Sequence, residues 1–167
     1  MNRRNNKGRS LLRNIIIIAV IGAILVGGGV LSFLADQASR KAPLEVDPYP
    51  NAELWGYRNR QTSSREVYYK IRDASPDVVA EYYQSRLNQH TKGSEENCVR
   101  LPAEGEYPAS ELGPGVPPYA FRCLFDNSGF QSTQYTQVTV SPGLYNSDPE
   151  YNTEGLTVVQ YVQVWQP

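Results

Sequence analysis

Residues 65–90, "REVYYKIRDASPDVVAEYYQSRLNQH", are the most informative about the fold, because their hydrophobic period changes along the segment. In its first eight residues, apolar and polar side chains alternate. Val67, Tyr69 and Ile71 fall on one face of an extended chain, and mostly charged residues fall on the other. This period of two predicts a strand with one face buried.

A helix is predicted to follow directly. Ser75 suits the N-cap, Pro76 suits the first helical position, and Asp77 suits the positive end of the helix dipole. We expect the helix to end near Gln89. Its apolar face is predicted from residues at helical spacing, namely Val78, Val79, Tyr82, Tyr83 and Leu87.

Three more strand patterns lie further along the chain. They are "YAFRCLF" (119–125), "QYTQVTV" (134–140) and "LTVVQYVQVW" (156–165), and the turn sequence "DNSG" (126–129) separates the first two. The last pattern is apolar on both faces, as in a central strand. We therefore expect an α+β domain, with an antiparallel sheet of about four to five strands covered by one helix.

The chain has two cysteines, Cys98 and Cys123, which are 25 residues apart. Outside the cytoplasm such a pair usually forms a disulfide. A Pro/Gly-rich segment (99–118) separates them, so the bond would pin both ends of an irregular loop. Free or metal-bound thiols are the alternative, but there is no CxxC motif and only one histidine.

The segment between Arg13 and Asp36 contains 22 consecutive uncharged residues. As a helix it would span roughly 33 Å, enough to cross a bilayer core of about 30 Å. A cleaved export signal is the alternative, but its apolar core is usually only about 7–15 residues long. In addition, Asp36 would occupy the −3 position of a cut after Ala38. We therefore predict an uncleaved transmembrane anchor.

Charge predicts how the chain is oriented in the membrane. From residue 42 onward the chain has nine Lys/Arg against sixteen Asp/Glu, a net −7, which argues against binding nucleic acid. The first 13 residues contain no acid, and their basic side chains are Arg3, Arg4, Lys7, Arg9 and Arg13. Basic residues favour the cytoplasmic side, so we expect a single-pass protein of the bacterial cytoplasmic membrane with its C-terminal domain outside. The expected parts are a cytoplasmic tail (1–13), a transmembrane helix (14–35), a stalk (36–47) and an extracytoplasmic domain (48–167).

Small residues recur along the predicted anchor. Ala19, Ala23 and Gly27 are four residues apart and so share one ridge, while Gly28 and Ser32 extend a neighbouring ridge. Small residues at this spacing let two membrane helices approach closely. The pattern favours packing against a membrane-protein partner, although glycine and alanine are also common in membrane helices generally.

The sequence gives little indication of catalysis or of a cofactor. The single histidine, His90, falls at the predicted helix end, where a histidine commonly just favours the negative end of the dipole. Oxygen-bearing side chains alternate through "NSDPEYNTE" (146–154), which is partly typical of a calcium loop. However, Tyr151 stands where an EF-hand needs glycine and Thr157 where it needs glutamate, which favours a solvated acidic loop.

The chain has twelve tyrosines, which could form either a binding platform or core. Tyr68 is on the opposite face from Val67 and Ile71, so it is a candidate for an exposed platform residue. The alternative, which we favour, is core packing with the hydroxyls in contact with water. That alternative concerns Tyr82, Tyr83, Tyr119 and Tyr161.

Residues 47–90 resemble a pattern found in uncharacterised bacterial membrane-anchored or lipoprotein ectodomains. The resemblance rests on "DPYPNAEL" followed by "SSREVYYKIRDASPDVVAEYYQSRL", which match a YPxA opening, an SPxxV helix start and a YYxxxL helix. It implies an exported α+β domain and brings no catalytic residues. Where those relatives continue with Gly-Trp, this chain has "HTKGSEENC".

The expected function is therefore that of a non-enzymatic accessory subunit of a bacterial membrane protein complex. The alternative is a stand-alone module that binds a cell-envelope glycan or peptide through exposed tyrosines and the Pro/Gly loop.

Overall fold

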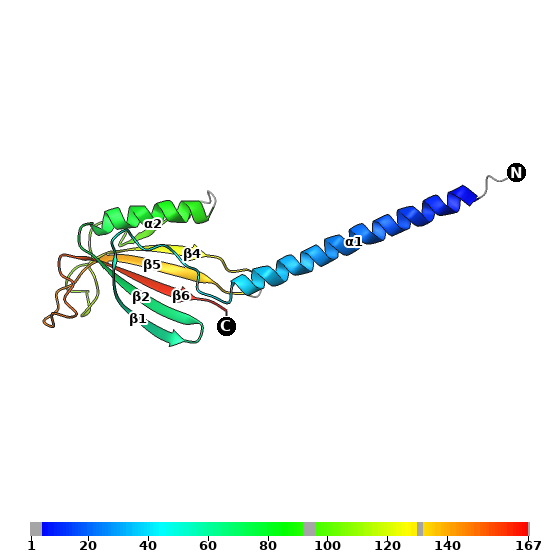
Figure 1. The fold of residues 1–167 in the computed structure, drawn as a ribbon. Helices are drawn as coiled ribbons and strands as arrows, with labels where there is room; N and C mark the ends of the chain where they lie inside the picture. Colours follow the sequence, from blue (N-terminus) through cyan, green and yellow to red (C-terminus); the bar gives the residue numbers. More distant parts are fainter. Residues whose placement is uncertain (1–4, 92–95, 130–131, 167) are drawn as a thin grey trace. The chain divides into compact units, whose positions relative to one another are not determined.

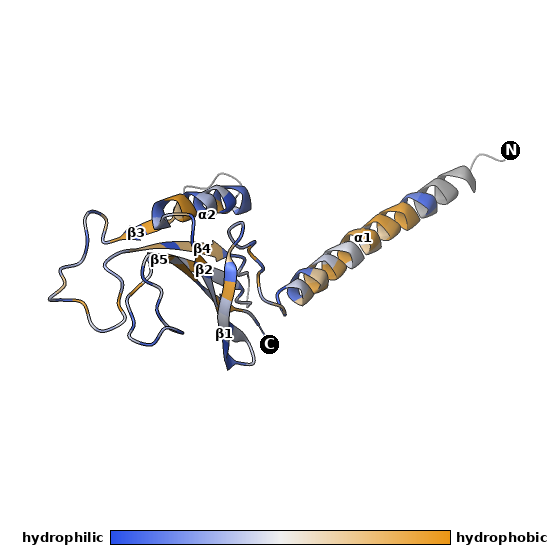
Figure 2. Ribbon diagram, turned by 60° about the vertical axis from the view of Figure 1, so that its left-hand side comes forward, coloured by the Kyte–Doolittle hydropathy of each residue, from blue (hydrophilic) through white to orange (hydrophobic). Residues whose placement is uncertain are grey.

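The computed structural model describes residues 5–91, 96–129 and 132–166, and it divides into two units, residues 1–39 and 40–167. The first unit is helix α1 (Asn5–Ser39; Figure 1), and Figure 2 shows that its middle part is hydrophobic. Within the described residues, its segment Arg13–Ser39 is the one helix long and apolar enough to cross a membrane, as an anchor or an export signal would. The expected span 14–35 lies inside this segment.

The second unit contains a six-stranded sheet, so the expected count of about four to five strands was too low (Figure 1). Every neighbouring pair is antiparallel, and the order across the sheet is β1-β2-β6-β5-β4-β3. The strands are β1 (Glu53–Gln61), β2 (Ser64–Ile71), β3 (Val99–Leu101), β4 (Ala120–Asp126), β5 (Tyr135–Pro142) and β6 (Thr157–Val164).

The two strands that the sequence did not predict are the edges of the sheet. β1 is largely exposed, so its polar and apolar residues do not alternate in the way that a buried face would require. β3 has only three residues, too few to show a period. The antiparallel arrangement and the central position of β6 between β2 and β5 are as expected. The expected turn 126–129 opens a longer connection, because β4 ends at Asp126 and β5 begins at Tyr135.

Helix α2 (Pro76–His90) begins as its sequence predicts. The Ser75 side chain accepts a hydrogen bond from the Val78 amide, and Pro76 occupies the first turn. The predicted apolar face is nearly right, but Val78 is 49% exposed and Ala80 is buried in its place. The buried residues of the helix are Pro76, Val79, Ala80, Tyr83 and Leu87.

The core lies between α2 and one face of the sheet, which we call the inner face. The side chains of β2, β4, β5 and β6 alternate between this face and the opposite outer face. Each of the four strands contributes buried residues to the core, as the period-two patterns predict. The inner-face members are Val67, Ile71, Cys123, Phe125, Val138, Val140, Val159 and Tyr161.

Residues 42–52 lie against the same core beside α2, and we call them the strap. Their apolar side chains pack on the buried cluster, and their backbone carbonyls accept hydrogen bonds from core side chains. Gln163 donates to Leu44 O at 2.7 Å, Thr136 donates to the same oxygen, and Tyr161 donates to Asp47 O at 3.2 Å. The packed apolar residues are Leu44, Val46, Tyr49 and Ala52.

The strap changes the expected division of the chain. The boundary between the units falls at Ser39/Arg40, so residues 40–47, which we expected to form part of a stalk, belong to the domain. The prolines did indicate an extended chain correctly. However, an extended segment can equally well lie along a sheet, and the core groups that hold this one are about 90 to 120 residues further along the chain.

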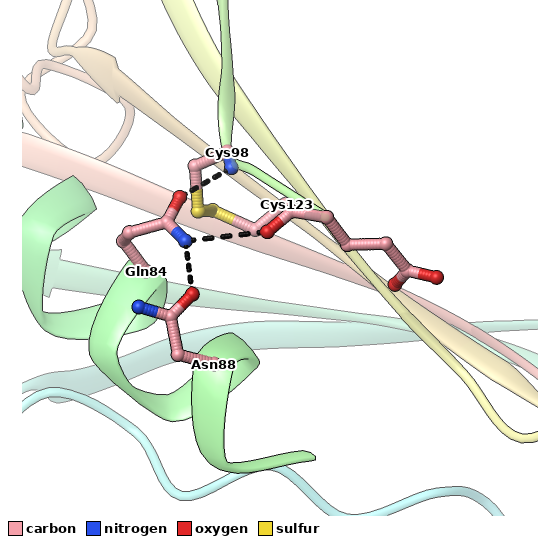
Figure 3. The surroundings of a disulfide bond; sticks show 5 residues. Gln84, Asn88, Cys98 and Cys123 are labelled. Atoms are coloured by element: carbon pink, nitrogen blue, oxygen red, sulfur yellow. Dashed lines mark hydrogen bonds between the residues drawn. A yellow bond between two sulfur atoms is a disulfide. The ribbon is translucent and has the colours of Figure 1, made fainter. Parts of the chain in front are cut away.

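The expected disulfide joins Cys98 to Cys123 (Figure 3). Gln84 of α2 reinforces it, because its carbonyl oxygen accepts from the Cys98 amide at 2.6 Å and its NH2 group donates to Asn88 at 2.6 Å and to Glu96 O at 3.4 Å. The bond therefore ties β4 to the segment that leads into β3, directly against the helix.

Candidate functional site

The outer face of the sheet carries the candidate site. Two long loops, residues 102–119 and 143–156, leave the same end of the sheet (Figure 1) and enclose an open cleft of about 750 Å³ above β2, β5 and β6. This volume lies within the range of about 300–1,000 Å³ typical of ligand clefts. The lining residues are Trp55, Tyr68, Pro114, Gly115, Pro117, Thr139, Ser141, Pro142, Gly143, Leu144, Tyr145, Asn146, Ser147, Tyr151, Thr153, Val158 and Gln160.

The floor of the cleft is held by a hydrogen-bond network centred on Tyr68. The Tyr68 hydroxyl donates to Glu66 Oε2 at 2.9 Å and accepts from Gln160 Nε2 at 3.1 Å. Glu66 is 2% exposed and also pairs with Arg60 at 2.6 Å. Burial, followed by the hydrogen bond to Glu66, raises the pKa of Tyr68 above its usual value. The phenol therefore stays neutral, and its position is fixed from both sides.

Trp55 stands beside Tyr68 with its orientation set by two neighbours. The rings of Trp55 and Tyr68 meet edge to face, with centroids 6.2 Å apart. Lys70 Nζ lies 4.2 Å from the Trp55 centroid and 3.4 Å from Glu150 O, so this ammonium joins the floor to the 143–156 loop. These contacts give the cleft a preorganised aromatic floor.

The 143–156 loop forms one wall and is closed at its base. The Gly143 amide donates to Leu156 O at 2.7 Å, and Leu144 exchanges hydrogen bonds with the buried Thr153. A Cβ atom at Gly143 would overlap the Thr153 carbonyl oxygen, so only glycine permits this approach. The loop thereby presents Tyr145 and Tyr151, which are 71% and 53% exposed.

The alternating acids and amides of this loop act on its own backbone. Asn146 Oδ1 accepts from the Asp148 amide at 2.9 Å, Asp148 Oδ1 accepts from the Glu150 amide at 3.0 Å, and Asn152 Oδ1 accepts from the Glu154 amide at 3.2 Å. Such turns explain the spacing of two that partly matched a calcium loop. Among the described residues, no group of three or more His, Cys, Asp and Glu side chains could hold a metal ion.

The second wall comes from the Pro/Gly-rich loop between the cysteines. Pro114, Gly115 and Pro117 face the cleft, and Gly115 has a φ of +78°, which glycine adopts at little cost. The Tyr107 amide donates to Pro118 O at 2.8 Å and so closes the loop on itself. The disulfide at its base and this internal bond allow a loop with little regular structure to act as a wall.

The chemistry of the cleft is uncharged. Among the described residues that line it, none is acidic, basic or a histidine, although the domain from residue 42 onward has a net charge of −7. The lining instead combines aromatic rings, prolines, hydroxyls and side-chain amides. Such a surface can pack against apolar faces and form hydrogen bonds with neutral groups. The adjacent cation, Lys70, is already engaged by Trp55 and Glu150 O.

Apart from the cysteines and the tyrosines, the described residues singled out in the sequence lie on α1 and α2. Ala19, Ala23, Gly27, Gly28 and Ser32 are on α1, where the helix places them on the expected ridges. Arg13 also lies on α1; Arg3 and Arg4 lie outside the described residues, as do the side chains of Lys7 and Arg9. His90 ends α2, where Nε2 is 3.0 Å from Asp126 O.

Of the five tyrosines considered in the sequence, Tyr68 alone lines the cleft. Tyr83 and Tyr161 are core residues, as expected, but their hydroxyls bond each other inside the core and are not in contact with water. Tyr82 and Tyr119 are only half-buried. Sequence reasoning missed Trp55, Tyr145 and Tyr151. The sequence did contain a signal for Tyr145 and Tyr151. Both lie in or next to a polar, turn-rich segment without a periodic apolar pattern, which indicates exposed rings.

Comparison with protein-family models, with curated proteins and with solved structures finds no match for this chain. The resemblance over residues 47–90 therefore stays a prediction.

Proposed function

We propose that this chain is a non-enzymatic, single-pass membrane protein whose extracytoplasmic domain binds an uncharged ligand in the outer cleft. The observation that carries the proposal is the cleft itself, an aromatic and neutral surface on an otherwise acidic domain. The alternative considered from the sequence, a binding module, thus gains more support than the accessory subunit.

The placement in the membrane rests on two independent features. The apolar segment of α1 is long enough to span a bilayer, and five basic residues precede or begin it. The disulfide at the foot of the Pro/Gly loop fits an oxidising compartment. Both features support a cytoplasmic N-terminus and an extracytoplasmic domain in a bacterial cytoplasmic membrane.

The non-enzymatic part of the proposal rests on where the single histidine lies. His90 contacts a backbone carbonyl and the ring of Phe125, 5.7 Å between centroids, at the end of α2. It does not line the outer cleft. The cleft residues can position a ligand, and the described lining has no carboxylate, imidazole or amine of the kind that commonly acts as a general base.

Binding can be tested with the full chain in nanodiscs of a zwitterionic phospholipid. Replacing Trp165 with Phe leaves Trp55 as the only tryptophan, so its emission reports on the cleft. Polysaccharide, peptide and lipid extracts of a bacterial envelope would be titrated in turn. We expect one extract to change the Trp55 emission saturably.

A charged blocking variant supplies the control. Thr139→Arg places a long cation on the floor and should abolish the response, whereas Thr133→Arg, on an exposed residue outside the cleft, should retain it. If no extract changes the emission, or if Thr139→Arg responds like Thr133→Arg, the cleft is not a binding site.

A second candidate is the accessory subunit, favoured by the ridge of Ala19, Ala23 and Gly27 on α1. Nothing lies within 4 Å of a Cβ built on Gly27, so the ridge can accept another helix. Changing both Ala23 and Gly27 to Leu should release a co-purifying membrane protein while leaving the chain in the membrane; Ile24→Leu is the control. Purification of the unchanged protein alone and monomeric in mild detergent would exclude this role.

A further inference from the structure

We infer that the ligand of the outer cleft is a neutral glycan. This inference rests on the proposed function and narrows it to one class of ligand. Three features of the cleft support it: the placement of its aromatic rings, the neutral polar groups of its described lining, and the paired backbone of the strands that form its floor.

The rings are the first feature. A pyranose ring presents a face of C–H bonds that packs on an aromatic ring, with hydroxyl groups around its rim. Tyr145 and Tyr151 hold large rings in water on the polar 143–156 loop, while Trp55 and Tyr68 form the floor below. A sugar chain between them would cover apolar ring surface that the free protein leaves hydrated.

The polar groups are the second feature. Hydroxyls of Thr139 and Ser141 and the amides of Asn146 and Gln160 stand among the rings. Sugar hydroxyls both donate and accept hydrogen bonds, so they can pair with the donor and with the acceptor atoms of these hydroxyls and amides. The described lining has no charged residue, and the adjacent Lys70 ammonium is engaged by Trp55 and Glu150 O, so an anionic polymer would lose its hydration with little ion pairing in return.

The backbone of the floor argues against an extended peptide. β2, β6 and β5 each pair with a strand on both sides, so their ladder groups are engaged and cannot take an added strand. A proline-rich peptide instead docks on aromatic side chains, so decaproline is the peptide comparator in the test. A ligand recognised through its rings and hydroxyls needs no free strand edge.

The experiment uses the full chain with Trp165→Phe in phosphatidylcholine nanodiscs, which avoids detergents with sugar headgroups. The probes are cellohexaose, maltohexaose, chitohexaose and mannohexaose, with hexagalacturonic acid as the anionic comparator and decaproline as the peptide comparator. We expect at least one neutral hexasaccharide to change Trp55 emission saturably, and to bind at least tenfold more tightly than either comparator.

Variants connect that binding to the cleft. Tyr145→Ser should weaken the affinity at least fivefold, whereas Tyr57→Ser should change it less than twofold. Tyr57 is a matched control because it is 68% exposed, against 71% for Tyr145, and it does not line the cleft. Equal effects of the two substitutions would overturn the inference.

The remaining outcomes separate this inference from the proposed function. Tighter binding of decaproline or of hexagalacturonic acid overturns the neutral glycan and leaves a ligand-binding cleft. A response to the peptide or lipid extract of the envelope, with none to the hexasaccharides, has the same meaning. If neither the extracts nor the probes change the emission, both the inference and the proposed function are wrong.

Discussion

The same strands form both faces of the sheet, but other elements cover the inner face and leave the outer face open. The inner face is closed by α2 and the strap, and even its buried polar groups are used to hold backbone carbonyls. The outer face leaves four aromatic residues around an open, uncharged cleft. The inner face therefore determines stability, and the outer face is available for binding.

Of the changes that test this difference between the two faces, deleting part of the strap should have the largest effect on stability. A protein lacking residues 1–39 should fold, whereas one lacking residues 1–47, cut at the expected domain start, should not. The longer deletion uncovers core next to Leu44 and Val46, and it removes the carbonyls that Gln163 and Thr136 bond. Each lost partner of a buried group costs about 1–3 kcal/mol, against a total stability of about 5–15 kcal/mol for a domain.

Urea denaturation followed by near-ultraviolet circular dichroism would compare the two truncated proteins. Equal unfolding midpoints would show that residues 40–47 are a passive stalk after all.

The buried tyrosines of the inner face should make stability fall at high pH. The Tyr49 amide donates to the Tyr83 hydroxyl at 3.1 Å, this hydroxyl meets that of Tyr161 at 2.9 Å, and Tyr161 donates to Asp47 O. Burial raises the pKa of Tyr83 from 10.0 to about 12 and also raises that of Tyr161. In the unfolded chain both phenols ionise near pH 10, so the stability is complete below pH 10 and is lost as the pH rises toward 12.

For Tyr83 alone, the free energy of unfolding should fall by about 3 kcal/mol as the pH rises from 10 to 12. Urea midpoints of the full chain at several values between pH 8 and 11.5 would measure it. Tyr83→Phe should lower the stability at pH 8 and flatten the alkaline slope, whereas the exposed Tyr57→Phe should leave both unchanged. A slope that is the same in Tyr83→Phe would contradict this assignment.

The same contrast explains how much the sequence could predict. Helix α2 and the inner sides of β2, β4, β5 and β6 follow from local periods, because a buried face needs a repeating pattern. Glu66 was expected on a solvated face, yet it is 2% exposed since Arg60 of the unpredicted β1 and Tyr68 cover it. The cleft unites β1, the central strands and two loops, and no local period connects these segments.

A smaller effect is expected at the base of the 143–156 loop. Gly143→Ala would push a Cβ atom into the Thr153 carbonyl oxygen, which should cost about 1–3 kcal/mol. The displaced loop carries Tyr145 and Tyr151, so the affinity for the cleft's ligand should fall as well. Thermal unfolding of the full chain measures the first effect and Trp55 emission the second. Gly113→Ala, where the nearest atom is at an ordinary 3.9 Å, should change neither.

The smallest expected effect is the loss of an aromatic ring from the outer face. Tyr145→Ser should change the free energy of unfolding by less than about 0.5 kcal/mol, as for most surface substitutions away from caps, cores and networks. The reason is that its ring is 71% exposed in the free protein and so contributes little burial. The exposed Tyr57→Ser on β1 provides the reference in the same urea titration. A destabilisation of 2 kcal/mol or more, on the scale of about 1.5–3 kcal/mol for burying a large apolar side chain, would mean that Tyr145 is part of the packing. Both faces would then contribute to the stability of the domain, and the exposed rings would no longer indicate a ligand-binding surface.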